Sequence, residues 1–179
     1  QDYLGAGLAG GDVDRDGYDD LLVGAPGIDE GGANAGAWYL VEGGASWYGE
    51  DTAADAASLR IDGDSSNDGI GRGHPVVADI DGDMDLDILH GARQEVPRLF
   101  QNRFAESGNV LTAYRDVTGS NFPAGYSTGD GHYEQEMGDF DADGDVDIYG
   151  LNWAAGFGFT DVTMKNTGAG VFNTLTTLT

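Results

Sequence analysis

The sequence of 179 residues contains no cysteine, which excludes disulfide bonds and any site that depends on a thiolate. Basic residues are also scarce, because 8 lysines and arginines stand against 32 aspartates and glutamates, for a net charge of −24. A chain this acidic is repelled by nucleic acids and by anionic membrane surfaces, so neither is expected as a partner. Apolar residues make up 40% of the chain, which indicates a folded core rather than a disordered chain.

Long apolar runs are missing as well. No run approaches the roughly 20 residues that cross a bilayer, so membrane insertion is not expected. The chain starts at Gln1 without a methionine or a signal-peptide pattern, and we expect a soluble mature product or a fragment. Glycine, in contrast, is abundant, and its 31 copies predict many turns.

An acidic segment occurs three times, at 12–20, 79–87 and 139–147, with starts 67 and 60 residues apart. Each copy runs directly into a short apolar stretch, at 21–23, 88–89 and 148–149. This spacing is too long for a short solenoid repeat and suits a four-stranded unit. We therefore predict an all-β fold of three four-stranded β-propeller blades, as part of a larger propeller or assembly.

The rest of the chain supports this fold class. Apolar and β-branched segments between glycine-rich turns predict further strands at 37–41, 57–61, 98–102, 110–117 and 162–166. Residues 48–57 could form a helical turn, and no longer helix is expected. We interpret 1–179 as a single β-propeller-type domain or fragment, with repeats at approximately 5–69, 70–125 and 126–179.

The acidic segments have the spacing of a calcium loop. Calcium takes six to eight oxygen ligands at about 2.3–2.6 Å, and alternating aspartates on a tightly curled loop can turn several carboxylates towards one ion. With loop positions numbered 1 to 9, we expect carboxylates from positions 1, 3, 5 and 9 and a backbone carbonyl from position 7. The predicted ligands to about three Ca²⁺ ions are Asp12, Asp14, Asp16, Tyr18, Asp20, Asp79, Asp81, Asp83, Asp85, Asp87, Asp139, Asp141, Asp143, Asp145 and Asp147.

Two other interpretations of these segments were weighed. An EF-hand is excluded, because it needs glutamate at position 12 and flanking helices, whereas these loops have valine, histidine and glycine there and predicted strands on either side. Solvated aspartate-rich turns would need no ion, but three copies in one register favour a cation site.

One loop departs from the pattern at position 6. Glycine there permits a sharp turn with positive φ, and it is present as Gly17 and Gly144. The second loop has Met84 instead, so we expect this loop to be strained or weaker unless Gly82 relieves the turn.

The first copy, Asp-x-Asp-x-Asp-Gly-x-x-Asp followed by Leu-Leu-Val-Gly24-Ala25-Pro26, resembles the FG-GAP repeat of integrin α-subunit β-propellers. The other two resemble the related bacterial VCBS repeats, including an Asn-x-Gly-x-Gly-x-Phe turn at 166–172. The resemblance covers essentially the whole chain. It implies structural loop ions, an extracellular or cell-surface location after secretion, and a role in adhesion, ligand binding or surface architecture.

We therefore expect a non-enzymatic, calcium-binding extracellular module with a structural or adhesive role, alone or as a subunit of a surface or filamentous assembly. The alternatives are a propeller that binds a carbohydrate or protein ligand and, third, part of a polysaccharide-degrading enzyme. A closed propeller has four to eight blades. Three repeats would leave two sheet faces uncovered, so the expected partners are other blades or copies of this chain.

Other candidate residues carry weaker signals. His74, His90 and His132 lack metal-ligand spacing and are expected on the surface or in loops. Glu134 and Glu136 could form an acid/base pair, but we expect surface carboxylates. The aromatic residues of the turn-rich segments are expected to pack between blades, and 153–159 is a candidate interface; they are Trp47, Tyr48, Trp153, Phe157 and Phe159. No catalytic residue and no organic cofactor are predicted.

Overall fold

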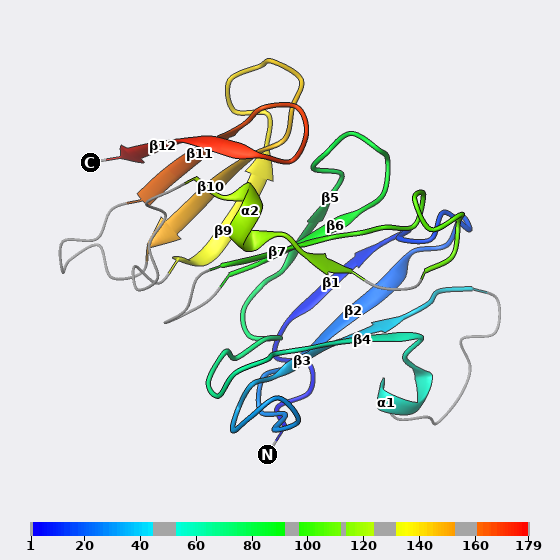
Figure 1. Cartoon of the computed structure of the whole chain (residues 1–179). Helices are drawn as coiled ribbons and strands as arrows, with labels where there is room; N and C mark the ends of the chain where they lie inside the picture. The colour runs from blue at the N-terminus through cyan, green and yellow to red at the C-terminus, as the bar shows by residue number, and fades with distance from the viewer. Residues whose placement is uncertain are drawn as a thin grey trace.

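The computed structural model describes residues 2–44, 53–91, 97–111, 114–123, 132–152 and 161–178. Twelve strands in these residues form three four-stranded antiparallel sheets, each with its strands in sequence order. The chain is therefore all-β, and its sheets are propeller-type blades. Figure 1 shows them side by side in an open arc that does not close into a ring.

The first blade contains β1 (Leu8–Gly11), β2 (Asp20–Ala25), β3 (Ala37–Val41) and β4 (Leu59–Asp62). The second contains β5 (Val76–Ala78), β6 (Asp87–His90), β7 (Arg98–Gln101) and β8 (Arg115–Asp116). The third contains β9 (His132–Gly138), β10 (Asp147–Asn152), β11 (Asp161–Asn166) and β12 (Phe172–Leu178). Two one-turn helices, α1 (Ala53–Ala56) and α2 (Thr118–Asn121), complete the described elements.

The core lies between the blades because side chains alternate across each strand. Leu22 and Leu40, which are register partners, face the second blade and pack with its Ile88 and Phe100. In the second blade, Leu89 and Leu99 occupy the positions equivalent to Leu22 and Leu40, and they pack against the third blade. There they meet Ile148, Val162 and Met164. The first and second blades thus each present an apolar row to the blade that follows.

The third blade differs on the equivalent row. Tyr149 takes the place of Leu22 and Leu89, and its register partners are Glu136 on β9 and Thr163 on β11. Glu136 is exposed and Tyr149 is half-buried. Phe140, at loop position 2, is 54% exposed, whereas Val13 and Ile80 at the same position are 3% and 4% exposed. This row of the third blade is therefore polar where the rows of the other two blades are aliphatic, and the exposed Phe140 ring lies against Tyr149 with 6.3 Å between the ring centroids.

The opposite end of the array is covered by the chain itself. Val23 and Tyr39, on the face of the first blade that points away from the second, are buried in a cluster with Ala25. Ile28 and Ala57 pack against that cluster from outside the sheet. The expectation that both end faces are uncovered is therefore wrong for the first blade.

Polar contacts fasten neighbouring blades at repeated positions. The Asn102 side chain, directly after β7, donates to the carbonyl of Val13 at 2.9 Å. The Asn166 side chain, at the end of β11, donates to the carbonyl of Ile80 at 2.8 Å. Both asparagines are fully buried. Because a buried carbonyl without a partner costs free energy, these amides stabilise the joints between blades.

Several local predictions need correction. The strand predicted over 110–117 shortens to Arg115–Asp116, and the turn of helix at α2 was not predicted. His90 is not a surface or loop residue, because it lies on β6 with 0% exposure against Trp38, with a distance of 5.6 Å between the ring centroids. Exclusion from water lowers the pKa of His90 to about 3, so this imidazole is neutral.

The predicted helical turn at 48–57 is described only from residue 53, where α1 lies. The five aromatic residues of the turn-rich segments, and with them the candidate interface at 153–159, lie outside the described residues. In the part of the chain that the structure describes, no helix is long and apolar enough to cross a membrane.

Candidate metal centre

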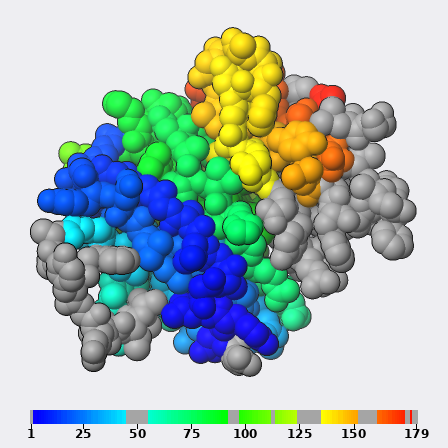
Figure 2. All heavy atoms as spheres, turned by 180° about the vertical axis from the view of Figure 1, so that it is seen from behind, coloured from blue at the N-terminus to red at the C-terminus, as the bar shows by residue number. Residues whose placement is uncertain are grey.

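The three acidic loops connect the first two strands of each blade. The first loop is 12–20, the second is 79–87 and the third is 139–147, between β1 and β2, β5 and β6, and β9 and β10. Figure 1 shows all three along one edge of the arc. In the space-filling view of Figure 2 the segment around the third loop, in yellow, stands out from the body of the protein.

Each loop curls through two residues with left-handed backbone. Position 4 has φ of 58° at Arg15, 81° at Gly82 and 62° at Ala142. Position 6 has φ of 90° at Gly17, 97° at Gly144 and 71° at Met84. Since position 4 is left-handed in all three loops, Gly82 does not relieve the turn at Met84. Met84 has a Cβ, which makes a positive φ unfavourable, so strain in the second loop is still expected.

The aspartates at positions 1 and 9 hold the curl together. The position-1 carboxylate accepts from the amide of position 6, at 3.1 Å for Gly17 to Asp12 and 3.0 Å for Gly144 to Asp139. The position-9 carboxylate accepts from the amide of position 2, at 2.8 Å for Val13 to Asp20. It also accepts from a backbone amide at or just beyond the end of the third strand of its blade; these donors are Gly43, Asn102 and Asn166.

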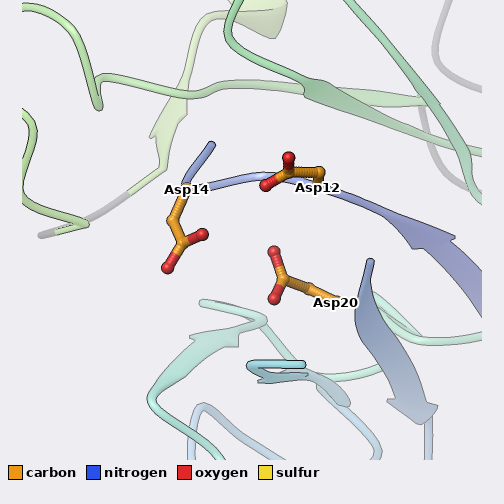
Figure 3. Close-up of side chains that lie close together, drawn as sticks. All are labelled: Asp12, Asp14 and Asp20. Carbon is orange, nitrogen blue, oxygen red and sulfur yellow. The ribbon is translucent and has the colours of Figure 1, made fainter. Parts of the chain in front are cut away.

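In the first loop, carboxylate oxygens of Asp12, Asp14 and Asp20 lie within 4.8 Å of one another. Figure 3 shows the three side chains pointing towards a common centre. Burial raises the pKa of Asp14 above its ordinary value, and the charges of Asp20, Asp16 and Asp12 raise it further. Burial also raises the pKa of Asp20, against the lowering effect of its two backbone amides. This cluster thus concentrates negative charge that a cation would stabilise.

The first loop fits a calcium ion. Oxygens at about 2.3–2.6 Å from one ion lie at most about 5 Å apart, which matches the observed separation. All three candidate ligands are hard carboxylate oxygens, the ligand type that calcium prefers, whereas zinc would favour nitrogen and sulfur. Each oxygen that accepts one amide hydrogen has a second lone pair, so the bonds to the backbone leave room for a metal ligand.

In the second loop the gathered carboxylates are Asp79, Asp81 and Asp83, within 4.8 Å. Burial raises the pKa of Asp83 to about 6. Asp87 at position 9 is only 2% exposed, and burial raises its pKa to about 8 although two backbone amides act in the opposite direction. The side chain of Gln101 on β7 donates to Asp81.

A cation from the first loop reaches the second. Arg15 Nη2 lies 2.6 Å from Oδ1 of the fully buried Asp85 and donates to the carbonyl of Asp83 at 2.6 Å. Its Nε donates to the carbonyl of Met84 at 3.2 Å. A further carboxylate group, made by Asp83, Asp85 and Glu106, also gathers here. The guanidinium therefore ties the two loops together across the joint between the blades.

In the third loop Asp139, Asp141 and Asp147 lie within 4.8 Å of one another. Here a cation of the chain is already present, because Lys165 Nζ on β11 contacts Asp141 and lies 2.6 Å from Oδ2 of Asp143. These bonds raise the pKa of Lys165, and the ammonium lowers the pKa of Asp143.

The structure thus gathers positions 1, 3 and 9 in the first and third loops, and positions 1, 3 and 5 in the second. Asp16 and Asp143, at position 5, lie outside these groups. They accept from the amide of position 7, as Asp83 also does, and Asp143 accepts from Lys165 as well. The position-9 Asp87 lies outside its loop's group, and at position 7 the Asp85 side chain pairs with Arg15. Neither Tyr18 nor Asp145 contributes a side chain to a group found among the described residues.

Sequence reasoning missed the residues that reach the loops from elsewhere. These are Arg15, Gln101, Glu106 and Lys165, together with the two asparagines of the blade joints. One signal was available for part of this set, since Gln101-Asn102 and Lys165-Asn166 occupy matching places at the ends of the third strands of their blades.

A comparison with protein-family models finds a match in the first blade. The family model for the FG-GAP repeat matches residues 4–41, a span that includes β1, the first loop, β2 and β3. This chain carries an FG-GAP repeat. The FG-GAP match and the three blades together make the chain a β-propeller-type module. Among curated proteins, no significant match to the sequence is found.

Proposed function

We propose that this FG-GAP protein is a calcium-stabilised, non-enzymatic extracellular module with a structural or adhesive role. The observation that carries the proposal is the first loop, where three carboxylates converge within 4.8 Å with their pKa values raised at Asp14 and Asp20. Calcium bound there would connect β1 to β2 and brace the edge of the blade. The residues act as ligands and loop ties, and no step of chemistry is assigned to them.

The non-enzymatic part of the proposal is supported by the way the carboxylates are used. Asp12 and Asp20 each accept two backbone amides, which fixes their orientation inside the loop. Two cavities between the blades, lined by residues such as Leu22 and Tyr114 in one and Leu99 and Gln101 in the other, measure about 10 Å³ each. A cavity of that size holds at most a single water molecule.

The extracellular part of the proposal rests on charge and ion supply. Weak calcium sites fill at millimolar calcium, which is the extracellular range, and the net charge of −24 favours a chain surrounded by cations. For the ligand-binding and polysaccharide-degrading alternatives, no specific observation in the described residues adds support.

The test is thermal unfolding of the full chain in chelator and in calcium, with ion binding measured by calorimetry on the same sample. An ion at 100 times its Kd stabilises the folded state by about 2.7 kcal/mol, so a clear rise in Tm is expected. Asp14→Asn should lose part of the rise, whereas Asp2→Asn, the same charge change at an exposed position outside the loops, should keep it. Absence of both binding and stabilisation would refute the proposal.

A further inference from the structure

The three loops carry the same number of carboxylates, but the residue at the end of the third strand differs from blade to blade. This residue directly precedes the one whose backbone amide donates to the position-9 aspartate. It is Glu42 in the first blade, Gln101 in the second and Lys165 in the third. A carboxylate, a neutral amide and an ammonium therefore occupy one equivalent place. The charge at this place therefore differs between the blades although each loop has five aspartates.

In the third loop this ammonium occupies the acidic cluster. Lys165 Nζ bonds to Asp141 and Asp143, which are positions 3 and 5 of the expected ligand set. An ion placed among Asp139, Asp141 and Asp147 would share Asp141 with the ammonium and lie within a few ångströms of it. Like charges at that distance repel strongly, and the lysine is tethered to β11 and always present. The third loop therefore does not fit a calcium ion.

The other two loops show the contrast. In the described residues around Asp12, Asp14 and Asp20, no basic side chain pairs with the cluster. In the second loop Arg15 binds Asp85 and backbone carbonyls, and it leaves the side chains of the Asp79, Asp81 and Asp83 cluster to Gln101 and backbone amides.

We propose that Lys165 closes the third loop as an internal, tethered cation, so that this chain binds two calcium ions rather than the three that its loops suggest. The inference rests on the proposed function for the first two loops and corrects it for the third. It follows that the third blade holds its loop closed in the absence of calcium, while the first two depend on the ion.

The decisive experiment is the calcium stoichiometry of the full chain, measured by native mass spectrometry and calorimetry with calcium chloride as the only added ligand. The wild type should bind two ions. Lys165→Met, which keeps the length of the side chain and removes its charge, should bind three. Arg60→Met is the matched control, because Arg60 pairs with Asp62 and Glu30 on the first blade, away from the loops, and should leave the count at two.

Stability supplies a second readout. In chelator, Lys165→Met should melt below the wild type, and calcium should restore most of the difference. If that variant does not fold, Asp→Asn changes in the wild type serve instead. Asp14→Asn should reduce the count from two to one, whereas Asp141→Asn should leave it at two.

The outcomes separate the two proposals. Three ions in the wild type, or a count that Lys165→Met does not raise, would overturn the role of Lys165 while leaving calcium binding intact. Loss of an ion on Asp141→Asn would overturn it as well. Absence of calcium binding by the wild type and by Lys165→Met would overturn both proposals, because the variant is required to gain a site.

Discussion

Met84 gives the sharpest test of the loop geometry, through the substitution Met84→Gly. Its φ of 71° is left-handed, its side chain is 72% exposed, and the equivalent residues in the other loops are Gly17 and Gly144. Left-handed backbone costs a residue with a Cβ about 1–2 kcal/mol. Glycine also raises the conformational entropy of the unfolded chain, and this destabilises the folded state by about 0.4–1 kcal/mol. A net stabilisation of about 1 kcal/mol is expected from these two effects.

The backbone contacts of the loop survive this change. The Met84 amide donates to Asp79 at 3.0 Å and its carbonyl accepts from Arg15 at 3.2 Å, and both groups belong to the main chain. For a chain of this size a gain of about 1 kcal/mol raises Tm by about 2–4 °C. Thermal and urea unfolding, each in chelator and in calcium, measure the effect.

Met84→Ala is the matched control for the same position. It removes the exposed side chain but keeps the Cβ, so it should show no gain. If Met84→Gly is no more stable than Met84→Ala, the left-handed turn does not carry the cost assigned to it. In the reverse direction, Gly17→Ala should lose about 1 kcal/mol, because Gly17 has a φ of 90° in open space.

Three further predictions concern the joints between blades. Asn102→Ala should destabilise the chain by about 1–3 kcal/mol in urea unfolding, because it leaves the buried carbonyl of Val13 without its donor. His90 has a folded pKa of about 3 against 6.5 unfolded, so the unfolded chain takes up the proton first and stability falls as pH drops below 6.5. Between pH 7 and 5 this loss amounts to about 2 kcal/mol, and urea titrations should show that His90→Phe lacks it. Arg98→Met should lower the free energy of unfolding by about 1–2 kcal/mol, measured by thermal unfolding. Arg98 lies 3.3 Å from the buried Asp68 and 2.9 Å from Asp116, and high salt should not restore the lost stability.

The strands and the loops could be predicted because their signals are local. The strand predicted at 37–41 coincides with β3, where five consecutive residues are buried. The acidic loops were recognisable from a spacing of two residues between aspartates, and the structure places each between two strands. A pattern of this kind depends on the residues of one turn, so it can be interpreted without the fold.

The cations at the loops could not be predicted in this way. Lys165 is 24 residues from Asp141, and Arg15 is 69 residues from Met84. Their contacts exist because antiparallel pairing brings the end of the third strand to the loop and because blades stack. His90 was misplaced for a similar reason, since its burial is decided by Trp38 from the neighbouring blade.

The polar outer row of the third blade makes the array directional. A blade stacked on Glu136, Tyr149 and Thr163 in the manner of the first two joints would bury a carboxylate against an aliphatic surface, which costs several kcal/mol unless a partner group pairs with it. Addition of a further blade through the same kind of joint would therefore be unfavourable at this face. A neighbour docked here would need donors for Glu136 and an apolar surface for Phe140, so the two ends of the arc present different surfaces.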